Sequence, residues 1–134
     1  MIDLVWVFLG GGLGAASRWL VSRLSTRFLG AGFPWGTTIV NLLGCFLIGL
    51  VLGLVERGLG GKRLKPLAVT GFLGGLTTFS SYAYETIDLL RRGAWAKALA
   101  NVALDNAGGL ACAVAGLVLG LYLGSAIPAG GTAL

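Results

Sequence analysis

The sequence predicts an all-α integral membrane protein with four transmembrane helices, and three observations support this fold class. First, 56% of the 134 residues are hydrophobic and only 11% are charged, whereas about a quarter of the residues of a soluble domain are charged. Second, the charged residues divide the chain into four apolar stretches, each long enough for the roughly 20 residues of a bilayer crossing. Third, the connections between the stretches are short, which leaves room for one domain and little else.

The four helices are expected at about residues 3–24, 34–56, 66–90 and 97–124. They form a single transmembrane domain over residues 1–127, and residues 128–134 are expected to be a disordered tail. Pro34 and Pro66 stand where the second and third helices begin, because proline is favoured in the first turn of a helix. The second and third stretches are free of charge in their centres, whereas the fourth contains Asp105.

Glycines in the apolar stretches recur at a spacing of four residues. The repeats are Gly10 and Gly14, Gly49 and Gly53, and Gly116, Gly120 and Gly124. Small residues at this spacing give a flat helix surface that permits close packing of transmembrane helices. Residues 10–15 also match a dinucleotide-binding pattern, but that pattern requires a preceding strand, so we reject it here.

Several functional classes are excluded by composition. The chain has no histidine, which removes the central residue of zinc catalysis and of the Ser-His-Asp triad, and we expect no enzyme. Cys45 and Cys112 lie in apolar stretches without a Cys-x-x-Cys pattern and are interpreted as packing residues. The net charge is +5, but the basic residues lie at the ends of the apolar stretches rather than on one face, so nucleic acid is not an expected partner.

The basic residues give almost no preference for one orientation in the membrane. With four crossings, one side carries four of them: Arg57, Lys62, Arg63 and Lys65. The other side carries five, or six with Arg18: Arg23, Arg27, Arg91, Arg92 and Lys97. Basic residues favour the cytoplasmic side, so a near-equal count is compatible with insertion in both orientations and pairing of opposed copies. A weak single orientation remains open.

The third apolar stretch contains a run that is unfavourable for a continuous helix, GFLGGLTTFSSYAYE at residues 71–85. Its glycines each weaken a helix by about 1 kcal/mol relative to alanine, and Thr77 and Thr78 can compete for backbone hydrogen bonds. The run predicts a helix break near mid-membrane. Freed carbonyls at such a break can bind a cation, and the next helix N-terminus favours an anion. A merely kinked packing helix is the alternative.

Polar and aromatic side chains follow the predicted break on neighbouring helix faces. Phe79 and Tyr82 are three residues apart and share one face, and Thr78, Ser81 and Glu85 share the next. Ring edges carry partial positive charge and hydroxyls are adaptable donors. Together they can contact a small dehydrated anion without a fixed positive charge. Taken alone, the two rings could equally be packing residues.

Further candidates lie on the other helices. Asn41 in the second helix offers two N–H donors, with Thr38 one turn before it, although it could simply bond a neighbouring helix. Arg18 could cap the first helix, reach the interface or attract anions at a pore mouth. Asp105 is a functional candidate because carboxylates inside membranes are rare, although it could reach the interface.

Three segments resemble the CrcB/Fluc family of fluoride channels, in matching order and over nearly the whole length. GGLTTFSSYAYE resembles the third-helix segment of that family, GTTIVNLLGCFLIG its second-helix segment, and GGGLGAASRWL its first-helix segment. The resemblance implies four transmembrane helices, an antiparallel homodimer with dual topology, and two fluoride pores. It also implies a sodium ion at the dimer centre, bound by the backbone carbonyls of Gly74 and Thr77.

The resemblance also implies pore residues. By motif position these are Asn41, Phe79 and Tyr82, a polar track of Thr38, Ser80 and Ser81, Glu85 at the vestibule end, and Arg18 in the first helix. Tyr82 stands where the family usually has a second phenylalanine. Asn101 and Asp105 stand where it often has tyrosine and serine. We therefore expect Asp105 to point away from the anion path, to be protonated, or to alter transport.

The leading hypothesis is a fluoride-selective channel in the plasma or inner membrane. It would passively export fluoride from the cytoplasm and so reduce its toxicity. The alternative is a small proton-coupled multidrug exporter, which needs an exchangeable carboxylate and would use Asp105. A membrane scaffold would explain the glycine repeats, but not the hydroxyls and rings of the third stretch.

Overall fold

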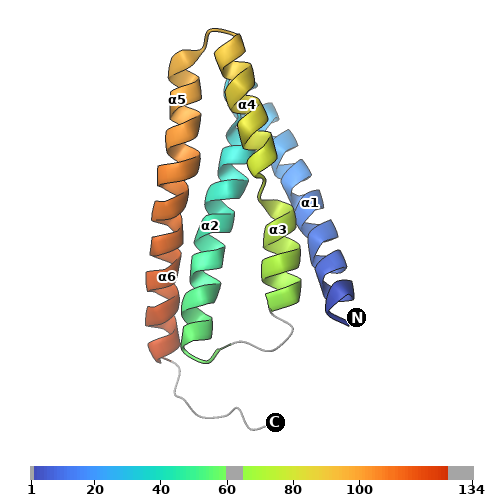
Figure 1. Ribbon diagram of the computed structural model, residues 1–134, viewed down its shortest axis with the longest axis vertical. Helices are drawn as coiled ribbons and strands as arrows, with labels where there is room; N and C mark the ends of the chain where they lie inside the picture. The colour runs from blue at the N-terminus through green and yellow to red at the C-terminus, as the bar shows by residue number, and fades with distance from the viewer. Residues whose placement is uncertain (1, 60–64, 127–134) are drawn as a thin grey trace.

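The structure, a computed structural model, describes residues 2–59 and 65–126 (Figure 1). Within these ranges the chain forms helices and no strand, which confirms the all-α prediction. The predicted tail at 128–134 lies outside the described residues. The elements are α1 (Ile2–Leu29), α2 (Trp35–Glu56), η1 (Lys65–Leu73), α3 (Gly74–Leu76), α4 (Phe79–Arg91), α5 (Trp95–Ala103), η2 (Leu104–Gly108) and α6 (Gly109–Ala126), where η marks wider turns of the π type.

These helices run along the length of an elongated bundle (Figure 1). α2 packs chiefly against α6, and α1 packs chiefly against η1 and α3. α5, η2 and α6 follow one another as a continuous helix, Trp95–Ala126. In Figure 1, α4 lies above α3, and it packs against α5. The short segment between α3 and α4 therefore faces α2 and η2 inside the bundle.

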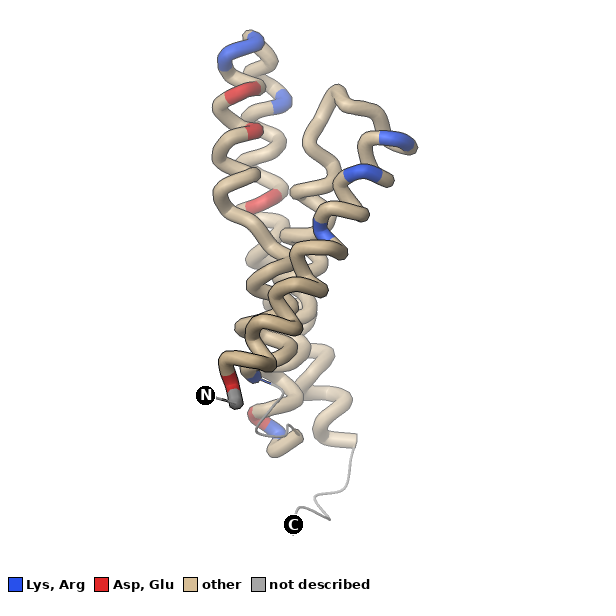
Figure 2. Tube along the Cα trace, turned by 90° about the vertical axis from the view of Figure 1, so that its right-hand side faces the viewer, with Lys and Arg blue, Asp and Glu red and all other residues tan. Residues whose placement is uncertain are grey.

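Among the described residues, three helices are long and apolar enough to cross a membrane: Asp3–Leu29, Trp35–Glu56 and Trp95–Ala126. The fourth predicted helix corresponds to η1, α3 and α4, which together also run the length of the bundle (Figure 1). Large apolar side chains cover the outside; Phe8 is 78% exposed and Leu110 71%. Figure 2 shows the charged residues gathered toward the two ends of the bundle. This surface suits contact with lipid.

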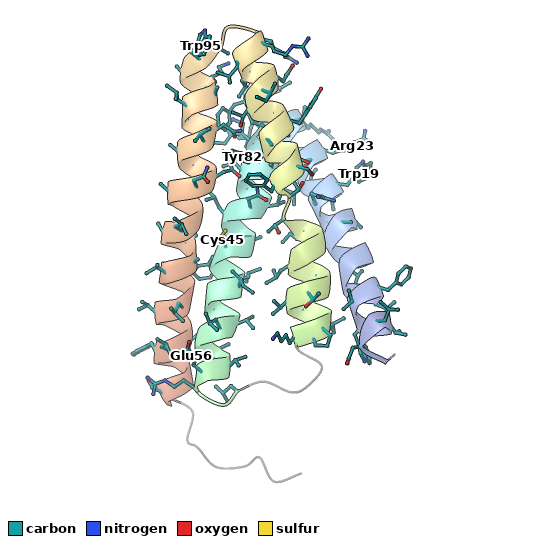
Figure 3. The ribbon with its side chains drawn as sticks, in the orientation of Figure 1. Trp19, Arg23, Cys45, Glu56, Tyr82 and Trp95 are labelled. Atoms are coloured by element: carbon teal, nitrogen blue, oxygen red, sulfur yellow. The ribbon has the colours of Figure 1, made fainter. Side chains whose placement is uncertain are left out.

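α1 continues to Leu29, beyond the expected end near residue 24. The expectation rested on the arginines, but arginine is a good helix former and does not end a helix. Gly30 ends it, because its φ of +83° lies in the left-handed region that glycine adopts freely. The guanidinium of Arg23 lies 5.0 Å from the centre of the Trp19 ring. Both side chains project outward (Figure 3), as expected where a helix leaves the apolar layer.

The glycine repeats lie in the helix contacts, which confirms their predicted packing role. A Cβ atom at Gly49 would meet the carbonyl oxygen of Ala113, and one at Gly116 would meet that of Phe46. α2 and α6 therefore approach each other backbone to backbone. Gly14 contacts the backbone of η1 in the same way. The close approach holds α2 and α6 in a fixed register.

Replacing Gly116 with alanine should destabilise the protein by about 1–3 kcal/mol, because the added Cβ overlaps backbone that cannot move aside. Thermal unfolding in detergent would measure the change. Gly12→Ala is the matched control: this helical glycine has no atom within 4 Å of a built Cβ, so the substitution should be neutral or slightly stabilising. Equal stability of the two variants would contradict the packing account.

Candidate functional site

A cavity of about 380 Å³ lies where α2, the junction of α3 and α4, and η2 meet. Tyr82 points inward from α4 at this level, with Cys45 below it on α2 (Figure 3). Five of the ten predicted site residues are in the described lining, whereas Arg18, Thr38, Ser80, Ser81 and Glu85 are not. The described residues that line the cavity are Asn41, Gly44, Cys45, Ile48, Val69, Leu73, Gly74, Thr77, Thr78, Phe79, Tyr82, Asp105 and Asn106.

Two residues between α3 and α4 have extended backbones. Thr77 has φ −81° and ψ 154°, and Thr78 has φ −153° and ψ 111°. The side-chain amide of Asn41 bonds the backbone at this point: its Oδ1 accepts from the Thr78 N–H at 2.8 Å, and its Nδ2 donates to the Thr78 carbonyl at 3.3 Å. Asn41 therefore bonds both backbone polar groups of Thr78, a residue with an extended backbone between the two helices.

The side chain of Thr78 caps the N-terminus of α4. Its Oγ accepts from the Ser81 N–H at 3.2 Å and lies 3.1 Å from the hydroxyl oxygens of both Ser80 and Ser81. Threonine is a good N-cap because its oxygen satisfies an amide at the helix start. Three hydroxyls therefore gather at a helix N-terminus, where the helix dipole favours negative charge.

Asp105 points into the site, so the expectation that it might point away is wrong. Its Oδ1 accepts from Asn41 Nδ2 at 2.7 Å, and its Oδ2 accepts from the Thr38 hydroxyl at 3.1 Å. The reason is the wide turn η2, Leu104–Gly108. Turns of the π type are often found at functional sites, and this one lets both Asp105 and Asn106 line the cavity.

The polar contacts continue above the cavity. Asn101 is fully buried; its Nδ2 donates to the Thr86 hydroxyl at 2.9 Å and its Oδ1 accepts from Thr38 at 3.4 Å. The Thr37 hydroxyl donates to Glu85 Oε1 at 2.8 Å. Asn101 was not among the predicted site residues, although it and Asp105 both accept from the Thr38 hydroxyl.

The two predicted pore rings lie together but differ in exposure. The centres of the Phe79 and Tyr82 rings are 5.3 Å apart, in a tilted arrangement. Phe79 is 76% exposed, whereas Tyr82 is half-buried. The Tyr82 hydroxyl accepts from Asn106 Nδ2 at 2.9 Å. The hydroxyl that distinguishes Tyr82 from phenylalanine therefore has a partner on η2, which fixes the ring against the cavity.

Arg18 is not brought to this site. It is half-buried on α1 and does not line the cavity. Gly74 and Thr77, the predicted sodium ligands, do line it.

The carbonyls of Gly74 and Thr77 lack the amides that an unbroken helix would provide. The Thr78 N–H, which would bond the Gly74 carbonyl, donates to Asn41 instead. The Ser81 N–H, which would bond the Thr77 carbonyl, donates to the Thr78 hydroxyl. Hard cations such as sodium prefer oxygen ligands, so the donor set fits the predicted ion.

A second cavity, of about 350 Å³, lies toward the end of the bundle where α4 meets α5. Glu85 lines it, together with Asp88, Arg92 and Lys97. Arg92 forms an ion pair with Asp88 at 2.6 Å, and Lys97 donates to the Gly32 carbonyl at 2.8 Å. Glu85 and Thr37 thus lie between this cavity and the polar groups around Asn41.

The chain matches one protein family and many curated relatives. The family model described as "CrcB-like protein, Camphor Resistance (CrcB)" matches residues 5–117. A "Fluoride-specific ion channel FluC" of Magnetococcus marinus is 42% identical over 120 residues, which are 89% of this chain and 98% of the relative. Proteins of the same name from Shewanella loihica and Agrobacterium fabrum are 43% and 41% identical, over 78% and 92% of this chain and 85% and 99% of their own lengths.

These matches cover both sides of the cavity, and the helices are long enough to cross a membrane several times. The chain is therefore a multi-pass membrane protein and belongs to the CrcB family.

Proposed function

We propose that this protein is a fluoride-selective channel that passively exports fluoride from the cytoplasm across the plasma or inner membrane and so reduces its toxicity. The single observation that carries the proposal is the chain of donors from the α4 N-terminus to α2. The hydroxyls of Thr78, Ser80 and Ser81 gather at the α4 N-terminus, and the Asn41 amide bonds the Thr78 backbone beside them. Asn41 and the Thr38 hydroxyl both donate to Asp105. The curated relatives bear the name of a fluoride-specific ion channel.

Fluoride is a small anion whose water shell must be replaced within the protein. Hydroxyl and amide N–H groups can reorient and donate to it, and ring edges such as those of Phe79 and Tyr82 offer a weaker positive field. No Lys or Arg is among the described residues that line the cavity. The site can therefore accept an anion without holding it by a fixed opposite charge.

The second cavity supplies an entry route in this proposal. Its charged lining is mixed: Arg92 is paired with Asp88, and Lys97 lies on the same cavity as Glu85. Glu85 and Thr37 stand between it and the donors around Asn41. A fluoride ion would pass from the second cavity, along the α4 hydroxyls, to the exposed Phe79 ring.

We further propose that the working form is an antiparallel homodimer with dual topology and two pores. The exposed Phe79 and Gly74 lie beside the open cavity, where a second copy would cover them. The near-equal basic counts on the two sides suit insertion in both orientations. The carbonyls of Gly74 and Thr77 from two opposed copies would then bind a structural sodium ion between them.

The multidrug-exporter alternative is not favoured. That function needs Asp105 as an exchangeable carboxylate in contact with a cationic substrate. The curated relatives at 41–43% identity share the name of a fluoride channel instead.

Pore variants should lose fluoride efflux from reconstituted liposomes. In Asn41→Asp, a carboxylate replaces the amide that bonds Thr78 and Asp105. The site then loses the N–H donors of Asn41 and gains a negative charge, and both changes disfavour an anion. In Phe79→Ile the ring edge is lost. We expect each efflux rate, measured with a fluoride electrode, to fall at least about tenfold, or about 1.4 kcal/mol in barrier height.

Phe8→Ile is the matched control for Phe79→Ile. Phe8 is 78% exposed on α1 and is not one of the residues that line the cavity. This variant should therefore conduct fluoride at the wild-type rate. If Asn41→Asp and Phe79→Ile both kept the wild-type rate, the pore assignment would be wrong.

Sodium should stabilise the dimer if the carbonyls of Gly74 and Thr77 bind it. A ligand that binds only the assembled form raises its stability by mass action. Exchanging sodium for N-methylglucamine, a cation too large for the site, should lower the melting temperature in detergent by several degrees. Identical melting in the two salts at equal ionic strength would count against the sodium site.

A further inference from the structure

The cavity contains one feature that an anion path does not require, which is the carboxyl group of Asp105. The other titratable groups in its described lining are Cys45 on α2 and Tyr82 on α4, and Glu85 lies one level above. None of the described lining residues is a Lys or Arg that could compensate a negative charge. The groups that Asp105 contacts therefore indicate its role in the cavity.

Those contacts are the donors proposed to solvate fluoride. Asp105 Oδ1 takes an N–H of Asn41 at 2.7 Å, and its Oδ2 takes the Thr38 hydroxyl at 3.1 Å. A carboxylate is an acceptor-only group with the same sign of charge as the permeating ion. It therefore fills the donors in the way that a dehydrated anion would.

We propose that Asp105 is a specificity-determining residue whose carboxylate competes with the permeating anion for the Asn41 and Thr38 donors. This inference rests on the proposed function. An entering fluoride must displace the carboxylate from at least one of these donors. The Asp105 carboxylate is thus an anion of the protein itself that competes for the donors in the path. It lowers the rate of fluoride passage, and it excludes more strongly those ions that bind the donors less strongly than the carboxylate does.

The structure allows such a displacement without loss of the site. Asn41 is also held by its Oδ1, which accepts from the Thr78 N–H and does not depend on Asp105. Asp105 is half-buried on the wide turn η2, beside the cavity into which its side chain could move. Thr38 has a second acceptor in Asn101 Oδ1 at 3.4 Å. Asn41 and Thr38 therefore each keep a hydrogen-bond partner when the carboxylate moves away.

The test compares wild type with Asp105→Asn in liposomes, by fluoride-electrode efflux with chloride efflux as a second readout. Asparagine keeps the shape and one acceptor oxygen of Asp105, removes the charge, and adds donors. We expect fluoride efflux to rise about tenfold or more, with the selectivity for fluoride over chloride reduced. Glu56→Gln is the matched control, because it removes an exposed carboxylate at the end of α2 that lines neither cavity, and it should leave efflux unchanged.

A second variant, Asp105→Ser, removes the charge with a smaller side chain and has the same expected direction if the asparagine variant does not fold. In wild-type protein, added fluoride should also shift the infrared carboxylate stretching band, and the shift should persist in Glu56→Gln. Unchanged or lower efflux in folded Asp105 variants, or no band shift with fluoride, would overturn the competition. If the wild type and the variants all fail to move fluoride, the proposed function itself fails.

Discussion

The hydrogen bonds between the Asn41 amide and the Thr78 backbone are the interaction on which the rest of the site depends. A peptide unit outside a helix is costly in an apolar environment unless its N–H and C=O are bonded within the protein. One amide side chain meets both needs here. As a consequence, the carbonyls of Gly74 and Thr77 lose their helical amides, and the Thr78 side chain is placed to cap α4. Two changes of bonding partner, at the Thr78 and Ser81 amides, thus expose two carbonyls and gather the hydroxyls at the start of α4.

The position of Asn41 is fixed in turn by helix packing. Glycines on α2 and α6 bring the two backbones into contact, which leaves no room for a shift in register. The same contact carries η2 to the level of Asn41, so Asp105 and Asn106 meet α2 and α4. The packing glycines of α2 and α6 therefore influence the cavity although most of them do not line it.

Much of the architecture could be predicted from the sequence, and the failures have physical causes. Apolar stretches located the helices, but arginines were poor markers of the end of α1, since Gly30 rather than charge ends it. Asn41, Thr78 and Tyr82, which the sequence singled out, line one cavity in the structure. The direction of Asp105 could not be derived, because the wide turn η2 changes which residues of that helix face inward. For the same reason, the hydrogen bond between Asn106 and the Tyr82 hydroxyl could not be predicted.

The central claim is that these donors conduct fluoride and reject chloride. The most direct measurement is passive efflux from liposomes that contain the purified wild-type protein, followed with a fluoride electrode and, in parallel, a chloride electrode. The account predicts fluoride efflux well above that of protein-free liposomes, with chloride efflux at the protein-free level. Chloride efflux equal to that of fluoride, or no efflux of either ion, would contradict it.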